Sequence, residues 1–215
     1  GVGDYSREFR ISEAVDAALK LARTVTGRKR IICCAGGFHG SSLEVLALTD
    51  NDARRNPVRP LVPGVVTIPY NDPDALEEAL RWKDAAAFVL EPVLGEGGAI
   101  PAHESFPAAA QQLCRKYVAL LIADEVQTGL GRTGAAFACT HYGIAPDIIT
   151  MAKSLGGGYV PVGAMAARGE LFDRAYGTFR TCLNHKNTFG GGALAMAAVM
   201  GMVTVLREER LSERA

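Results

Sequence analysis

The feature that most constrains this chain is the alternation of short apolar runs with segments of helical periodicity. Strands that alternate with helices are typical of an α/β fold, in which a mainly parallel sheet is covered by helices on both faces. Apolar residues recur at helical spacing in 12–23, where Ser12 is expected to cap the helix, and in 74–81, 105–116, 169–176 and 192–208. Strands are expected at 30–34, 65–69, 86–91, 119–124, 147–151 and 162–166.

Glycine and proline gather directly after several of these expected strands, at 36–40, 92–101, 129–134 and 156–161. In an open α/β sheet, the loops that follow the carboxyl ends of the strands build the ligand site. No internal repeat, low-complexity tract or linker interrupts the pattern, so one continuous domain over residues 1–215 is expected. The four clusters predict where its site lies.

The composition favours a small-molecule ligand. Twenty-three basic residues balance twenty-three acidic ones, which gives no long-range field to attract nucleic acid or an anionic membrane. The sequence shows neither an export signal nor an apolar run long enough to span a bilayer. The five cysteines form no C-x-x-C pair, which predicts reduced thiols and a cytoplasmic protein.

Two charged residues stand where apolar strands end. Asp124 closes the run 119–124, and Lys153 follows the run 147–151 and precedes three glycines. Taken singly, the acid is more often a loop or helix cap, and the lysine is more often a solvated loop residue. Together they match the needs of pyridoxal phosphate: a lysine that forms a Schiff base with its aldehyde and an acid that keeps its ring nitrogen protonated.

Several motifs, in order, resemble those of the class III pyridoxal-phosphate-dependent aminotransferases. They are FHG at 38–40, EPVLGEGG at 91–98, DEVQTGLGRTG at 124–134, YGIAPDIITMAKSLGGG at 142–158 and TFGG at 188–191. The resemblance covers almost the whole chain and extends to the ornithine and acetylornithine aminotransferases, to which 62–72 is also similar. It implies the large domain of fold type I, with a mainly parallel sheet of about seven strands.

The resemblance also implies roles for individual residues. Lys153 carries the cofactor and moves the proton in the reaction, and Asp124 pairs with the pyridine nitrogen. The other cofactor residues that it implies are Phe38 and Val126 on the two ring faces, Gln127 near the ring hydroxyl, His39 behind these contacts, Ser12 at the phosphate, and Thr188, which reaches the phosphate of a neighbouring subunit in a homodimer.

Three positions are expected to influence the choice of substrate: Ser41, Glu91 and Asn187. The relatives that act on ornithine or acetylornithine carry a substrate-binding arginine at the position of Ser41, so a carboxylate clamp is absent from that position. Glu91 is expected either to contact substrate or to anchor the turn 95–98. Where relatives bind the cofactor phosphate with a glycine followed by a small residue, this chain has Ile11 and Ser12.

The resemblance implies an aminotransferase that moves an amino group from a primary amine, distal in its substrate, to a keto acid. Full members of the family also have a segment before residue 12 and a small C-terminal domain, and the chain is expected to lack both. Aminomutase, racemase or decarboxylase chemistry on the same fold, and a truncated non-catalytic homologue, remain as alternatives. The sequence has no G-x-G-x-x-G, P-loop or G-x-S-x-G motif, and its histidines have no metal-ligand spacing.

Overall fold

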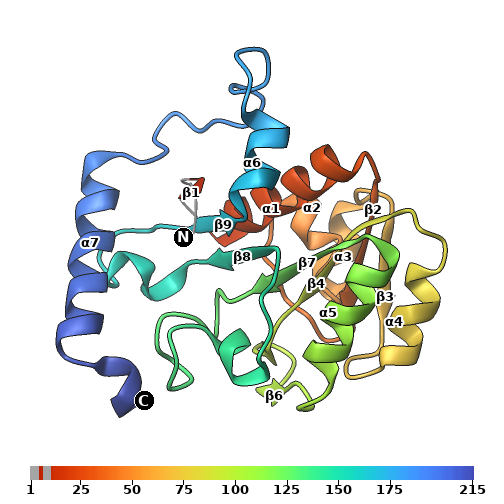
Figure 1. The fold of residues 1–215 in the computed structure, drawn as a ribbon, viewed down its shortest axis with the longest axis horizontal. Coiled ribbons are helices and arrows are strands. Elements are labelled where there is room, and N and C mark those ends of the chain that lie inside the picture. Colours follow the sequence, from red (N-terminus) through yellow and green to blue (C-terminus); the bar gives the residue numbers. More distant parts are fainter. Residues whose placement is uncertain (1–4, 7–10) are drawn as a thin grey trace.

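The fold is built on a seven-stranded, mainly parallel sheet (Figure 1). The computed structural model of the chain describes residues 5–6 and 11–215. Five neighbouring strands are parallel, whereas β9 is antiparallel to β8, and β1 is antiparallel to β9. Across the sheet the order is β1 (Tyr5–Ser6), β9 (Ala164–Ala167), β8 (Ile148–Met151), β7 (Leu120–Asp124), β4 (Ala85–Leu90), β2 (Arg30–Cys34) and β3 (Val65–Ile68).

Helices cover both faces of the sheet and enclose two cores. On one face, α1 (Ile11–Thr26) packs against α6 (Gly169–Tyr176) and the central strands. On the other face, α4 (Pro73–Leu80) and α5 (Phe106–Tyr117) lie side by side. All six residues of β4 are buried, as is typical of a central parallel strand covered on both faces. The expected α/β fold is therefore confirmed.

A long apolar helix stands at one end of the sheet. Helix α7 (Ala193–Glu208) packs against η3 (Lys153–Gly156), and its far end leads into η4 (Leu211–Arg214) (Figure 1). The helix is apolar almost throughout, but not all of its apolar side chains are buried: Leu194 is 73% exposed and Met200 is 65% exposed. Within the described part of the chain, no helix is long and apolar enough to cross a membrane.

The first helix differs from its expected start. Helix α1 begins at Ile11, so Ser12 lies inside the first turn and is not the cap. Its hydroxyl instead accepts a hydrogen bond from the backbone N–H of Ser41, at 3.0 Å, which ties the helix to the loop after β2. A hydroxyl near a helix start can cap its own helix or bond another segment, and here the second contact prevails.

The remaining differences of more than one residue concern the end of α1, which is Thr26, strand β9 and several short elements. The strand expected at 162–166 starts two residues later and ends one residue later, because Val162 packs against Gly156 of η3 and the ladder with β8 starts at Ala164. Several elements of two to five residues were not expected, since runs this short carry no clear periodicity. They are β1, α2 (Leu43–Leu46), α3 (Asp52–Arg55), η1 (Asn56–Val58), β5 (Val93–Leu94), β6 (Ile100–Pro101), η2 (Ala138–Tyr142), η3 and η4.

Candidate functional site

The candidate site lies along one edge of the sheet, where parallel strands end. Asp124 is the last residue of β7, Glu91 directly follows β4, and Lys153 follows β8 after one intervening residue. Asp124 stands opposite Thr150 in the parallel β7–β8 ladder. Because all three strands run in the same direction, their terminal side chains meet at the same edge.

Asp124 and His39 form a buried pair at this edge. The His39 Nδ1 atom lies 2.7 Å from Oδ2 of Asp124, and both side chains are at most 3% exposed. The other carboxylate oxygen, Oδ1, accepts from the Thr150 hydroxyl at 3.0 Å and from the backbone N–H of Val126 at 3.2 Å. Burial opposes a charged imidazole, but the hydrogen bond and negative charge of Asp124 outweigh it, so the pKa of His39 is raised.

Lys153 points to the same edge from a constrained backbone position. It is exposed and has a φ of +50°, a left-handed conformation that costs energy for a residue with a side chain. Its Nζ donates to the amide Oε1 of Gln127. Partial desolvation, followed by repulsion from Arg132, lowers the pKa of the Lys153 ammonium despite three nearby carboxylates. A lowered pKa increases the neutral, nucleophilic fraction near pH 7.

Glu91 connects two loops of the site. Its Oε1 accepts from the backbone N–H of Phe38 at 2.7 Å, and its Oε2 accepts from that of Gly95 at 3.3 Å. The side chain is 6% exposed. Burial raises the pKa of Glu91, partly offset by His39. Two roles were expected for Glu91, and the contact with Gly95 fits the one in which it anchors the turn 95–98.

Glu125 is a buried residue at the site that the sequence did not single out. It is 1% exposed, and its carboxylate accepts from the hydroxyl of Thr128 and from the backbone N–H groups of Ala138, at 3.0 Å, and Cys139, at 2.7 Å. These bonds hold the start of η2 against the loop after β7. The available signal was its position beside Asp124: a second acid at a buried strand end needs partners of its own.

The expected ring-stacking residues occupy the loops after β2 and β7. Val126 is 7% exposed and Phe38 is half-buried. The guanidinium carbon of Arg54, on α3, lies 4.8 Å from the centre of the Phe38 ring, and Arg54 also pairs with Glu96 at 3.4 Å. Arg54 was not expected at the site, because α3 itself was not predicted.

Ser12 and Ser41 meet across a close backbone approach at Gly40. Gly40 has a φ of +133°, and a Cβ there would lie 2.5 Å from the Ser12 hydroxyl oxygen and 2.9 Å from a methyl group of Val45. Only glycine therefore lets the loop that carries Phe38 and His39 pack onto the start of α1.

The close contact at Gly40 predicts how a side chain at this position affects the free energy of unfolding. Gly40→Ala is expected to lower the free energy of unfolding by about 1–3 kcal/mol more than Gly27→Ala, because a Cβ at Gly40 adds a clash to the unfavourable φ. Gly27 is the matched control, since its φ is +69° and no heavy atom lies within 4 Å of the added Cβ. Urea unfolding followed by circular dichroism measures both values. Equal losses would show that the contact at Gly40 does not constrain the loop.

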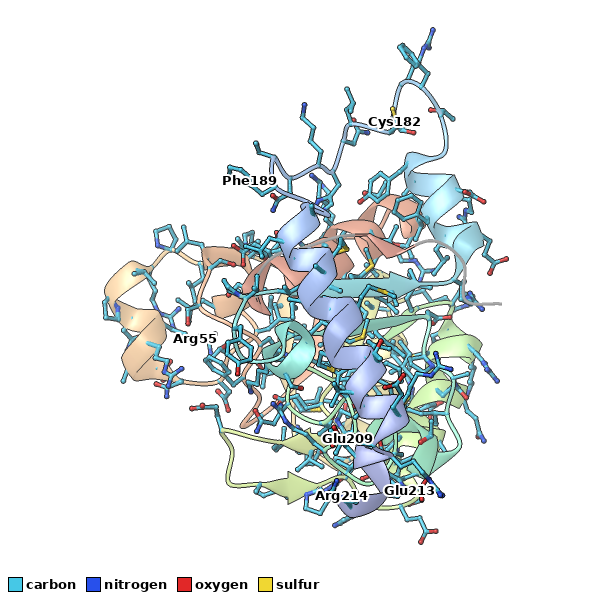
Figure 2. The ribbon with its side chains drawn as sticks, turned by 90° about the vertical axis from the view of Figure 1, so that its left-hand side faces the viewer. Arg55, Cys182, Phe189, Glu209, Glu213 and Arg214 are labelled. Carbon is cyan, nitrogen blue, oxygen red and sulfur yellow. The ribbon has the colours of Figure 1, made fainter. Side chains whose placement is uncertain are left out.

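Asn187 and Thr188 are not brought into this cluster. Both are exposed, and Asn187 bonds locally to the backbone N–H groups of Phe189 and Gly190, at 3.0 and 3.1 Å. Their segment, between α6 and α7, stands clear of the sheet, as the labelled Cys182 and Phe189 show (Figure 2). Phe189 is 75% exposed.

Two further features lie outside the cluster. Over residues 5–6 and 11–215, no group of three or more His, Cys, Asp or Glu side chains could hold a metal ion. A cavity of about 500 Å³ is lined by Arg55, Arg59, Ala47 and the loop 60–65. It contains none of the strand-end residues of the site.

Comparisons with known proteins point to one family. The sequence model of the class III aminotransferases matches residues 12–215. A putrescine aminotransferase of Pectobacterium atrosepticum is 43% identical over 212 residues, which are 95% of this chain and 45% of that protein.

Solved structures agree with the sequence match. An ornithine aminotransferase of Toxoplasma gondii, in which pyridoxal phosphate partially occupies the active site, superposes with a TM-score of 0.94 at 35% identity over 100% of this chain and 51% of its own. An acetylornithine aminotransferase of Elizabethkingia anophelis gives a TM-score of 0.81 at 36% identity, covering 100% of this chain and 51% of its own. This chain thus spans about half the length of the relatives that it matches.

Proposed function

Because the chain belongs to the class III aminotransferase family, we propose that it is the cofactor-binding large domain of an enzyme that transfers an amino group from a primary amine to a keto acid. One observation supports this above the others. Lys153 and Asp124 lie at the ends of adjacent strands. The amine of Lys153 donates to Gln127, and the buried carboxylate of Asp124 pairs with His39. The proposal covers all of residues 1–215.

The side chains at this edge fit pyridoxal phosphate. The cofactor needs an amine for its aldehyde, an anion for its ring nitrogen and a polar group for its ring hydroxyl. Lys153, Asp124 and Gln127 provide these groups. Oδ2 of Asp124 has one partner in the structure, His39, so it retains acceptor capacity for a ring N–H.

Bound pyridoxal phosphate supplies an electron sink for the carbon next to the substrate nitrogen. The residues of this chain do the rest. The Nζ of Lys153 would hold the cofactor through its aldehyde group and, once freed by the substrate amine, would carry the proton between the two carbons beside the substrate nitrogen. Asp124 would keep the ring nitrogen protonated, and His39 would stabilise the charge of Asp124. Ser12, at the start of α1, is the residue that we propose binds the phosphate.

The amine substrate that we propose is a distal one. Relatives of this chain are a putrescine aminotransferase and an ornithine aminotransferase, and each of these names specifies a substrate that has an amine at the end of a carbon chain. Ser41 brings no positive charge to the site, so a diamine does not meet a repelling cation at that position. Asn187, on the exposed segment between α6 and α7, is also proposed to contribute to substrate binding.

The two half-reactions test the proposed function. The purified chain, loaded with pyridoxal phosphate, is mixed with putrescine or ornithine, and we expect its visible absorbance to disappear. Addition of a keto acid such as pyruvate should restore the absorbance and produce the corresponding amino acid. Release of carbon dioxide or racemised substrate, without cofactor conversion, would instead favour decarboxylase or racemase chemistry. A chain that takes up no cofactor would support the non-catalytic alternative.

A homodimer is proposed as the working form. Thr188 lies on the exposed segment between α6 and α7, where Phe179 and Phe189 are 97% and 75% exposed, and such apolar exposure is typical of an interface. Light scattering should show two copies per particle, and Phe189→Asp should reduce this to one.

The cytoplasm is the proposed compartment. All five cysteines of the chain are free, and four of them are buried. Burial raises the pKa of the Cys33 thiol to about 11, which makes it inert at neutral pH. Cell fractionation tests this localisation.

A further inference from the structure

Gln127 accepts hydrogen bonds from two cationic side chains. Its side-chain oxygen accepts from the Nζ of Lys153, and its backbone carbonyl accepts from the Nη1 of Arg132 at 3.2 Å. One residue therefore holds the reactive amine and a guanidinium at the same time. Arg132 has no role in the function proposed above.

The loop that carries Arg132 is fixed on both sides of this residue. The backbone N–H of Leu130 donates to the carbonyl of Ala136 at 2.7 Å, and that of Gly134 donates to the carbonyl of Gly131 at 3.1 Å. A Cβ on Gly131 would lie 2.8 Å from the hydroxyl of Ser212, so the loop packs closely against η4. Arg132 thus projects from a constrained backbone, and its guanidinium is held near Gln127.

The charges around Lys153 act in opposite directions. Asp124 ends β7, Glu91 follows β4, and Glu96 lies in the β5–β6 loop, and all three carboxylates favour the charged ammonium. Arg132 is the cation that opposes them. A positive charge next to a lysine amine disfavours protonation of that amine. If Arg132 were removed, only burial would oppose the three carboxylates, which favour the charged form of Lys153.

We propose that Arg132 is a positioning residue for the reaction: through the Gln127 carbonyl it orients the amide that receives Lys153, and it holds a second positive charge beside the amine. The role rests on the proposed function, because a neutral Lys153 matters only if this residue attacks the cofactor. It predicts that Arg132→Gln leaves Lys153 more fully protonated at neutral pH.

Competitive acetylation tests this without the cofactor. The chain is treated with a trace of acetic anhydride at a series of pH values, and mass spectrometry of the Lys153 peptide gives the fraction of neutral amine. In Arg132→Gln, acetylation of Lys153 near pH 7 should fall by about two- to fivefold, the range expected for an exposed charge pair. Arg132→Lys keeps the charge and should stay near the wild-type rate.

Two controls separate charge from structure. Arg115→Gln removes the same charge from an exposed position on α5 and should leave acetylation of Lys153 unchanged. Salt is the second control, because raising its concentration screens an exposed charge. Salt screens Arg132 and the three carboxylates alike, so the difference in Lys153 acetylation between the wild-type chain and Arg132→Gln should shrink as salt is added. If Arg132→Gln unfolds, Arg132→Ala removes the same charge and provides the comparison.

The outcomes are distinct. Superimposable acetylation profiles for the wild-type chain and Arg132→Gln would overturn the role of Arg132, as would equal slowing in Arg132→Lys and Arg132→Gln. Cofactor attachment is then measured separately by visible absorbance. If the acetylation shift is present but no cofactor attaches to Lys153, the influence of Arg132 on the amine stands and the proposed function fails.

Discussion

Replacing Lys153 with alanine is expected to lower kcat/KM for amino transfer by about 10⁴-fold or more. The variant loses both the nucleophile that attaches the cofactor and the base that moves the proton, and proton transfer alone contributes about 10²- to 10⁴-fold. The fold should survive, because the Lys153 side chain is exposed and donates its hydrogen bond to the side chain of Gln127, itself exposed. Single-turnover absorbance with amine and then keto acid measures both half-reactions.

Lys116→Ala is the matched control for this variant. Lys116 is an exposed lysine on α5 that pairs with Glu77 at 2.6 Å, and its loss is expected to change stability little and activity not at all, because solvent screens an exposed pair. Full activity in Lys153→Ala would show that a different residue carries the cofactor.

Asp124→Asn is expected to lower kcat/KM by about 10²- to 10³-fold, the usual loss when one preorganised electrostatic contact is removed. The amide keeps the size of the carboxylate but loses the charge that would hold the ring nitrogen protonated. The free energy of unfolding should also fall by about 1–3 kcal/mol, because the buried hydrogen bonds of Asp124 are disturbed. Steady-state kinetics and urea unfolding provide the two values.

The same variant should reverse the pH dependence of stability contributed by His39. In the wild-type chain the pKa of His39 is raised by Asp124 against burial, so its contribution is complete below the unfolded pKa of about 6.5 and is lost as pH rises through the folded pKa. Glu91, whose pKa is also raised, acts in the same direction from about pH 4.5 upward. In Asp124→Asn, burial dominates and lowers the pKa of His39, so its contribution should grow as pH rises toward 6.5.

Three further variants isolate His39 in this experiment. His39→Gln should remove the change in slope near pH 6.5, and His103→Gln, at an exposed loop position, should not. Asp173→Asn on α6 tests the loss of one exposed carboxylate. Identical pH profiles for the wild-type chain and Asp124→Asn would mean that the Asp124–His39 pair does not govern this titration.

The regular part of the fold could be predicted because its signals are local. Strand β4 is apolar and buried at every position, and its expected range, 86–91, differs from the observed one by a single residue at each end. Helix α7 starts one residue after its expected start. The start of α1 was less predictable, because the hydroxyl of Ser12 bonds Ser41, a residue distant in the chain. Contacts of this kind depend on the assembled fold.

The site was predictable as a set of strand-end residues but not as a network. Asp124 and Lys153 stood out because charged residues at the ends of apolar strands are unusual. The contacts within the site depend on how the loops fold back. Asp124 bonds His39, and Gln127 accepts from both Lys153 and Arg132. Arg54 was missed because the four-residue helix that carries it has too little sequence for a periodic pattern.

The position at which pyridoxal phosphate attaches to the chain shows whether Lys153 carries it. The chain is incubated with pyridoxal phosphate, reduced with borohydride, digested and analysed by peptide mass spectrometry. We expect one labelled peptide, which carries the added mass on Lys153, and a label that decreases strongly in Asp124→Ala. A label spread over exposed lysines such as Lys116, or absent from Lys153, would contradict it.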